Sequence, residues 1–214
     1  MMQVYLMIEK LAENLINLKK EFASDYNGSS QIQEFLPLSN SDLFPIGEKE
    51  LKLLHEFAEK NPIYYNSFEK TLGGIPCIVY EGDINKYWLN SIQHNSSHAP
   101  FSPTWIMSAY IMTLFAKEYG YSQIIDIGSG DGRIAYCGKI IGLDSYSIEL
   151  DEQLTDLQKS FIEKNITTPA THTYHSTTSG TPLCKLCYTQ QMLEYLVTWE
   201  GLTFEEYLNN LSYG

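Results

Sequence analysis

The chain contains few cysteines, and they do not form the pattern of a disulfide framework. Its 214 residues include four unevenly spaced cysteines: Cys77, Cys137, Cys184 and Cys187. Secreted domains that depend on disulfides carry many more cysteines for their length. The N-terminus also lacks the basic segment and apolar block of a secretory signal, because Glu9 and Lys10 come too early for one. We therefore expect reduced thiols and a cytoplasmic location.

Basic residues are also scarce. The chain has 14 Lys and Arg against 26 Asp and Glu, which gives a formal net charge of -12. Such a balance disfavours a broad basic face for phosphate backbones, so nucleic acid is not an expected partner. Long apolar runs are missing too. The longest, Trp105 to Ala116, is interrupted by polar residues and is shorter than the roughly 20 residues that span a bilayer. We expect no membrane partner.

The first 94 residues are predicted to form a helical cap region. A first helix is indicated by apolar residues at helical spacing: Val4, Met7, Ile8, Leu11, Leu15, Leu18 and Phe22. Four segments are predicted to follow it: a linker or irregular wrap from Ser24 to Gly47, a helix from Glu48 to Lys60, a strand from Ile75 to Tyr80 and a helix from Asp83 to Gln93. We interpret His55, in the second helix, as a surface histidine.

The rest of the chain is organised around Gln123 to Arg133. Apolar β-formers in this stretch precede three glycines at alternate positions, Gly128, Gly130 and Gly132, and a helical pattern begins at Arg133. Glycines at such a turn let the backbone approach a ligand closely. The stretch therefore predicts a strand, a ligand-binding turn and a helix of an α/β fold.

The elements on either side of this turn predict a β-α-β unit. Ser102 and Pro103 are good residues for an N-cap and a first helical position. The predicted elements are a helix from there to about Tyr119, a strand from Tyr121 to Ile127, a helix from Gly132 to Ile141, a strand from Ser145 to Leu150 and a helix from Glu152 to Lys164. The ligand is expected at the carboxyl ends of the two strands.

The glycine spacing separates two kinds of nucleotide site. A dinucleotide fingerprint, Gly-x-Gly-x-x-Gly, would need its third glycine at the position of Arg133. The strand instead carries an acidic residue, Asp126, two positions before Gly128, where a dinucleotide-binding strand is normally apolar. Glu149 ends the next strand, where a carboxylate can accept hydrogen bonds from a ribose diol. The pattern favours a nucleoside with a cationic part and makes a dehydrogenase the weaker alternative.

The sequence from Asp126 to Arg133, followed by Ser147-Ile148-Glu149-Leu150-Asp151, resembles the class I S-adenosylmethionine-dependent methyltransferases. The similarity covers about residues 100 to 161. It implies an α/β fold with a Rossmann-like sheet and S-adenosylmethionine as cofactor. It also implies that Asp126 lies near the methionine end and that Glu149 binds the ribose hydroxyls. The turn that packs against the cofactor would comprise Gly128, Ser129, Gly130 and Gly132.

The preceding Pro100-Phe101-Ser102-Pro103-Thr104 resembles the Pro-Phe-x-Pro-Thr segment of small non-SET protein lysine methyltransferases. This resemblance implies that Pro103 and Thr104 lie beside the methionine moiety, whereas a bare helix N-cap is the simpler interpretation. It also implies a protein substrate, modified on lysine, and the acidic net charge would suit a basic polypeptide. Methyl transfer from a sulfonium needs alignment and proton removal rather than a catalytic triad, so the sequence identifies no catalytic residue.

The C-terminal part departs from the methyltransferase pattern. Thr167 to Cys187 is rich in threonine, serine and histidine, and it contains no apolar strand and no aspartate. Either the sheet is incomplete because the chain is truncated or altered, or the tail forms divergent strands, or it is a small separate element. The predicted domains are residues 1–94, the helical cap, and 95–214, the methyltransferase-like domain, in which 166–214 is divergent or truncated. An inactive cofactor-binding or interaction protein is therefore the alternative to an enzyme.

Two residue pairs in the same tail have the spacing of metal ligands. His172 and His175 are separated by two residues, as are Cys184 and Cys187, which would supply the two nitrogens and two sulfurs of a tetrahedral zinc site. The simpler interpretation is two histidines in a polar loop and two cysteines in an apolar turn. We favour it, and we expect no metal.

Overall fold

A long amphipathic helix, α1 (Met2–Asp25), begins the chain. The computed structural model describes residues 2–25, 32–85, 101–149, 151–165 and 173–175. The apolar stripe predicted for the first helix is the face that is buried: Ile8, Leu11, Leu15, Leu18 and Phe22. This face packs on the main body, so the helix covers the rest of the chain, as expected of a cap region.

An antiparallel sheet of three strands follows α1, in the order β1-β3-β2. Its strands are β1 (Ile32–Pro37), β2 (Tyr64–Leu72) and β3 (Ile75–Gly82). A two-residue loop, Gly73 and Gly74, joins β2 to β3, and both glycines have positive φ (53° and 80°). Such backbone angles match a tight hairpin to the twist of its strands, which explains the glycine pair.

This sheet corrects the prediction that residues 1–94 form a helical cap. Only β3 was expected, whereas β1 lies in the segment Ser24–Gly47 that was predicted to be a linker or irregular wrap. The strand β2 gave no signal because most of its side chains are exposed, so its pairing with β3 stabilises it more than an apolar face does. The helix predicted over Asp83–Gln93 lies almost entirely outside the described residues.

The second predicted helix is confirmed with its predicted bounds. Helix α2 (Glu48–Lys60) buries Leu51, Leu54, Phe57 and Ala58. His55 on this helix is not a surface residue, because its ring is partly buried and both ring nitrogens are hydrogen-bonded. Nδ1 lies 2.8 Å from the Tyr80 hydroxyl and Nε2 lies 2.9 Å from the Pro37 carbonyl oxygen. The strands β1 and β3 supply these partners, and neither contact could be seen in the helical spacing.

The helix after residue 101 begins later than predicted. Helix α4 (Ile106–Glu118) has Trp105 at its N-cap position and no side-chain cap from its own segment. Ser102 is therefore not the cap. The Ile106 N–H, at the first helical position, instead donates to Glu34 Oε2 on β1, at 2.5 Å. A carboxylate at a helix N-terminus satisfies a free amide and suits the helix dipole, so a distant strand caps this helix.

A parallel sheet of three strands holds the glycine turn. Strand β4 (Gln123–Ile127) pairs in parallel with β5 (Asp144–Glu149), as the sequence predicts, and helix α5 (Arg133–Ile140) connects them. Helix α6 (Glu152–Asn165) then leads to β6 (Thr173–His175), which pairs in parallel with β5. The segment 167–187, in which the sequence shows no apolar strand, contributes β6, a short polar strand that lacks an apolar pattern.

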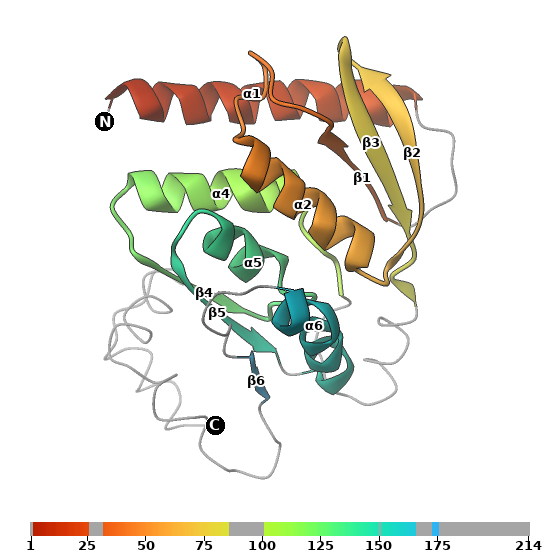
Figure 1. Cartoon of the computed structure of the whole chain (residues 1–214), viewed down its shortest axis with the longest axis vertical. Coiled ribbons are helices and arrows are strands. Elements are labelled where there is room, and N and C mark those ends of the chain that lie inside the picture. Colours follow the sequence, from red (N-terminus) through yellow and green to blue (C-terminus); the bar gives the residue numbers. More distant parts are fainter. Residues whose placement is uncertain (1, 26–31, 86–100, 150, 166–172, 176–214) are drawn as a thin grey trace, which may run out of the picture.

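The helices connect the two sheets through one continuous hydrophobic core. The core includes side chains of α1, β1, α2, α4 and α5. At its centre Phe57 of α2 meets Tyr136 of α5, with ring centroids 4.8 Å apart. Figure 1 shows α1, α4, α5 and the β4–β5 pair as successive layers from top to bottom, with the antiparallel sheet beside them. The chain therefore has a mixed α/β fold in which N-terminal elements pack directly on the helix that follows the glycine turn.

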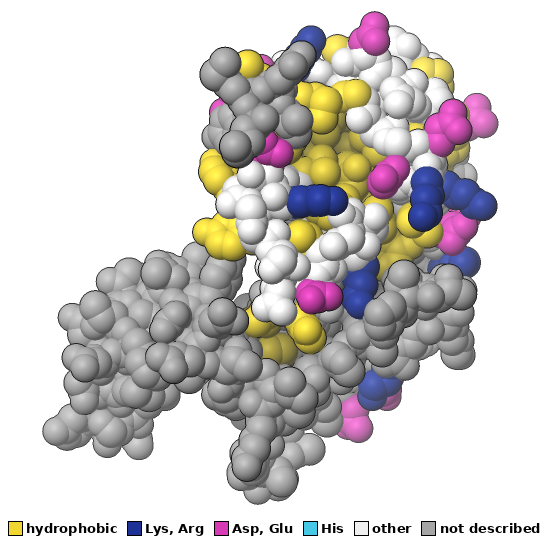
Figure 2. All heavy atoms as spheres, turned by 60° about the vertical axis from the view of Figure 1, so that its left-hand side comes forward, with side chains coloured by type: hydrophobic (Ala, Val, Ile, Leu, Met, Phe, Trp, Pro, Cys, Tyr) yellow, Lys and Arg dark blue, Asp and Glu magenta, His cyan; other side chains and the backbone are white. Residues whose placement is uncertain are grey.

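The described surface carries charges of both signs. On the face in Figure 2, Lys and Arg side chains are scattered among Asp and Glu and form no continuous basic patch among the described residues. Hydrophobic side chains also reach this face. Among the helices that the structure describes, none combines the length and apolar character needed to cross a bilayer.

Candidate functional site

The glycine turn between β4 and α5 is held by backbone hydrogen bonds. The amides of Gly128 and Ser129 donate to the carbonyl oxygen of Ile148 on β5, at 2.8 and 3.1 Å, and the Gly132 amide donates to the Ser129 carbonyl oxygen at 2.8 Å. Gly128, Gly130 and Gly132 all have positive φ, between 57° and 80°. Side chains rarely tolerate this conformation, so the three glycines define the shape of the turn.

The carboxylate of Glu149, at the end of β5, contacts this turn. Its Oε2 accepts the Gly130 N–H at 2.6 Å and its Oε1 accepts the Asp151 N–H at 2.9 Å. The side chain is 6% exposed. Glu149 therefore joins the end of one strand to the turn that follows the other. This arrangement places the predicted ribose-binding carboxylate next to the predicted cofactor turn.

Three buried polar atoms beside the turn have no hydrogen-bond partner among the described residues. They are Asp126 Oδ2, Ser147 Oγ and Gln158 Oε1. Asp126 and Ser147 are paired residues of β4 and β5, and Gln158 reaches the turn from α6. The Gln158 amide nitrogen donates to Ser129 Oγ at 2.9 Å and to the Gly130 carbonyl oxygen at 2.7 Å. Buried polar atoms are nearly always paired in native proteins, so this group marks a place where a polar ligand or water would bind.

The carboxyl of Asp126 has a strongly raised pKa. Burial, and to a smaller extent the nearby charges of Asp131 and Glu149, together raise the pKa of its carboxyl to about 7. A cation beside the carboxylate would oppose all three effects, because an opposite charge favours the ionised form. The electrostatics at the end of β4 therefore suit a positively charged group.

The segment before α4 forms one wall of the site. Phe101 packs so closely over the turn that a Cβ added at Gly130 would lie 2.4 Å from its ring. The Thr104 carbonyl oxygen accepts a hydrogen bond from Arg133, at 2.6 Å, which ties the segment to the start of α5. The Pro103 side chain is partly exposed and Thr104 is exposed. Both predicted residues thus lie in a segment that contacts the turn.

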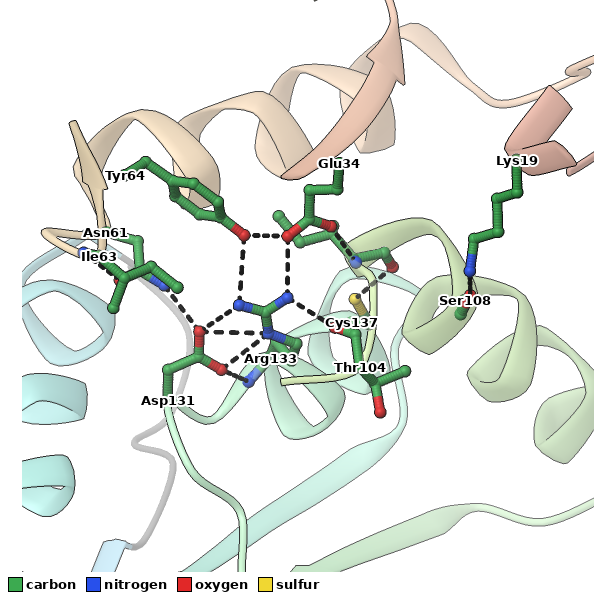
Figure 3. A network of polar contacts seen from close by, with 11 residues as sticks. Lys19, Glu34, Asn61, Ile63, Tyr64, Thr104, Ser108, Asp131, Arg133 and Cys137 are labelled. Carbon is green, nitrogen blue, oxygen red and sulfur yellow. Dashed lines mark hydrogen bonds and ion pairs between the residues drawn. The ribbon is translucent and has the colours of Figure 1, made fainter. Parts of the chain in front are cut away.

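Arg133, the first residue of α5, is the centre of a buried polar cluster. Figure 3 shows its guanidinium among groups from four segments of the chain. Nε and NH2 donate to the Asp131 carboxylate at 2.9 and 2.5 Å, NH1 donates to Glu34 Oε1 at 2.9 Å, and NH2 lies 3.3 Å from the Tyr64 hydroxyl. With Thr104, all five N–H donors of the guanidinium are used. Burial alone would lower the pKa of Arg133, but the negative charges around it raise that pKa well above its usual value.

Asp131, inside the glycine turn, belongs to the same cluster. Its Oδ2 also accepts a hydrogen bond from the Asn61 side-chain amide, at 2.8 Å. Asn61 follows the last residue of α2, and its own Oδ1 accepts the Ile63 N–H at 3.2 Å. Asn61, Asp131 and Arg133 are all less than 3% exposed. A residue of the glycine turn is therefore held by side chains of the N-terminal region.

The structure brings together most of the residues that the sequence selects. Asp126, Ser129, Glu149 and the three glycines meet where β4 and β5 end, and the segment with Pro103 and Thr104 lies beside them. Sequence reasoning missed Gln158, Ser147 and the cluster of Asp131, Arg133 and Asn61. The only available signal was a charged pair, Asp131 and Arg133, within a turn that otherwise consists of small residues.

The zinc alternative falls mostly outside the described residues. His172, Cys184 and Cys187 are not described, and of His175 only the backbone position in β6 is described. Within the part of the chain that the structure does describe, no group of three potential ligands is suitable for a metal ion. The thiols of Cys77 and Cys137 are free and buried.

Comparison of the chain with known protein families, with curated proteins and with solved structures found no match. Its functional interpretation therefore depends on its own residues and geometry.

Proposed function

We propose that the chain is an S-adenosylmethionine-dependent methyltransferase with a Rossmann-like sheet, of which β4, β5 and β6 are part. The observation that carries this proposal is the site at the ends of β4 and β5. There a turn with three left-handed glycines, the carboxylate of Glu149 and the buried, unpaired Oδ2 of Asp126 lie together. The glycine turn allows a nucleoside to approach the backbone closely. The carboxylate of Glu149 suits a ribose diol, and that of Asp126 suits a cation.

Each residue has a role in this proposal. Asp126 would lie near the cationic methionine end, where a neighbouring positive charge would favour its ionised form. Glu149 would bind the ribose hydroxyls, since a carboxylate oxygen that accepts one backbone amide still has capacity for another donor. Gly128, Ser129, Gly130 and Gly132 would pack against the cofactor, and Pro103 and Thr104 would lie beside its methionine moiety. The bound cofactor supplies an activated methyl group on a sulfonium.

We further propose a protein substrate that is methylated on lysine. The resemblance of residues 100–104 to protein lysine methyltransferases supports this choice. The net charge of -12 supports it as well, because an acidic protein attracts a basic polypeptide. The protein's own part in the reaction would be to align the amine with the methyl group and to accept a proton from the ammonium before transfer.

Calorimetric titration of the full-length protein with S-adenosylmethionine tests the shared premise. We expect binding by the wild type and a loss of at least tenfold in affinity for Glu149→Ala and for Asp126→Asn. Asp144→Asn is the matched control, because Asp144 is an exposed residue at the other end of β5 and should leave the affinity unchanged. Absence of binding by correctly folded wild-type protein would contradict the proposal.

The alternative function is an interaction protein that binds the cofactor without turnover. The face of the parallel sheet that carries Ile125, Ile127 and Ile148 favours it, because Ile127 is 47% exposed and its two neighbours are only partly buried. Incubation with labelled S-adenosylmethionine and a cell lysate distinguishes the two functions. An enzyme transfers label to a protein, and that transfer is lost in Glu149→Ala. A binder transfers none although calorimetry shows that it binds.

A further inference from the structure

The Arg133 cluster joins the glycine turn to elements that are distant in the sequence. Arg133 lies next to the turn, Glu34 comes from β1, Tyr64 from β2 and Asn61 from the end of α2. Figure 3 shows these side chains converging on the guanidinium and on the Asp131 carboxylate. Glu34 also accepts the amide of Ile106 and so connects the cluster to the start of α4. The contacts therefore cross the predicted boundary near residue 95.

The charges of the cluster make these contacts mutually dependent. Two carboxylates, Glu34 and Asp131, surround one guanidinium, and their side chains are 0% and 1% exposed. Such buried charges are tolerated only while they remain paired and hydrogen-bonded. If the N-terminal elements moved away, Arg133 would lose Glu34 and Tyr64, and Asp131 would lose Asn61. Asp131 would then have to find other partners, and the turn that carries it would have to move.

Asp131 is the link to the cofactor turn because it stands between Gly130 and Gly132. The Gly130 amide is the one that Glu149 accepts, and the Gly132 amide closes the turn on Ser129. A shift of Asp131 therefore displaces the Gly130 amide, whose hydrogen bond is accepted by the predicted ribose-binding residue, Glu149. Among the described residues of the N-terminal region, Asn61 is the one that donates a hydrogen bond to Asp131, so it is the residue at which this link can be tested.

We propose that Arg133 and Asn61 are positioning residues that make the shape of the cofactor turn conditional on the docked N-terminal region. The identity of the ligand rests on the proposed function. The coupling between the N-terminal region and the turn rests only on the contacts of the cluster. Coupling of this kind is reciprocal. Docking of β1 and α2 stabilises the turn, and a ligand on the turn must stabilise the docked N-terminal region by the same free energy.

Hydrogen exchange of ligand-free, full-length protein is the first test. Asn61→Ala removes the side-chain hydrogen bond to Asp131, and Asn61→Asp keeps the size and the acceptor for Ile63 but opposes Asp131 with a like charge. Both should speed exchange of the amides in residues 128–132, Asn61→Asp more strongly. The control is Tyr136→Phe, which removes another hydrogen bond between α5 and α2, from the Tyr136 hydroxyl to the Leu53 carbonyl oxygen at 2.8 Å. It should leave the turn unchanged.

The second test is the affinity for S-adenosylhomocysteine. We expect it to fall about tenfold in Asn61→Ala, the effect of losing one hydrogen bond to a charged group, and to stay within twofold in Tyr136→Phe. In the wild type the ligand should also slow exchange in β1, and Asn61→Ala should reduce that protection. Equal exchange of the turn in Asn61→Ala, Tyr136→Phe and the wild type would overturn the inference. If the wild type binds no ligand but the turn responds to the Asn61 variants alone, the proposed function fails and the coupling stands.

Discussion

At the scale of single residues, Asp126 has a carboxyl whose ionisation should affect the stability of the fold. Burial, with the nearby charges of Asp131 and Glu149, raises the pKa of its carboxyl to about 7. An ordinary aspartate in an unfolded chain has a pKa near 3.9. The folded protein therefore retains a proton on Asp126 at pH values where the unfolded chain has lost it.

The sign of the resulting pH dependence can be tested with Asp126→Asn. Between pH 4 and 7 the folded state binds more protons at this residue, so its contribution to stability falls as the pH rises. The variant lacks this decline. We expect its free energy of unfolding, relative to that of the wild type, to be larger at pH 8 than at pH 4 by roughly 3 to 4 kcal/mol. Urea unfolding at the two pH values measures this, and an equal difference at both would contradict the assignment.

Two glycines of the turn should respond differently to the same substitution. Gly128 and Gly130 both have positive φ, but a Cβ at Gly128 would meet nothing within 4 Å, whereas one at Gly130 would press into the ring of Phe101. Gly128→Ala should cost only backbone strain, about 1 to 2 kcal/mol. Gly130→Ala should cost a further 1 to 3 kcal/mol, roughly, from overpacking. Chemical unfolding of the two variants compares these costs. Equal losses of unfolding free energy would contradict the packing of Phe101 against Gly130.

At the scale of secondary-structure elements, α4 shows how a helix can begin without a local cap. Its first amide is satisfied by Glu34, a residue of β1 that is 72 positions earlier in the chain. Lys19 of α1 also contacts the start of α4. Its ammonium lies 4.2 Å from the centroid of the Trp105 ring and donates a hydrogen bond to the Ser108 hydroxyl at 2.7 Å. Tertiary contacts thus replace the capping residue that the sequence appeared to offer at Ser102.

This arrangement predicts that Ser102→Ala has little effect on stability. A true N-cap serine contributes about 1 kcal/mol, whereas an exposed residue outside such a feature contributes less than about 0.5 kcal/mol. Ser102 is exposed and lies four positions before the first residue of α4. Thermal unfolding should therefore be unchanged in Ser102→Ala. A loss of about 1 kcal/mol of unfolding free energy in Ser102→Ala would show that Ser102 does cap the helix.

Elements with an apolar period could be predicted, and elements stabilised by pairing alone could not. The helices α1 and α2 bury one face at helical spacing, and β4 and β5 are bounded by glycines and caps, so the sequence places them within a few residues. The strand β2 has mostly exposed side chains, and β6 is three polar residues long. Their stability comes from neighbouring strands, which a local pattern does not encode.

The same distinction holds for the site. The glycines, Asp126 and Glu149 can be recognised because they occupy fixed positions within two short segments, one strand with its turn and the end of the next strand. Asn61, Glu34 and Gln158 lie far from the turn in the sequence and reach it only through the packing of α2, β1 and α6. No spacing rule connects them to the turn, so they could be found only in the folded structure.

At the scale of the whole molecule, the N-terminal elements and the parallel sheet share one core. Phe57 of α2 packs against Tyr136 of α5, and the hydrophobic cluster continues from α1 through α4. The predicted boundary near residue 95 therefore does not separate two independent hydrophobic cores. We expect scanning calorimetry to show one cooperative transition, because neither part keeps its buried face without the other. Two resolved transitions would show that the parts unfold separately.

The order of synthesis gives the Arg133 cluster one more consequence. Arg133 emerges from the ribosome 99 residues after Glu34, which corresponds to about 5 to 20 seconds at usual rates of translation. Tyr64 and Asn61 also precede it. Glu34, Asn61 and Tyr64 are thus synthesised before Arg133. Asp131 and Arg133 can therefore pair with them as soon as they leave the exit tunnel. A circular permutant that begins near residue 101 would reverse this order and should fold more slowly, although its final contacts would be the same.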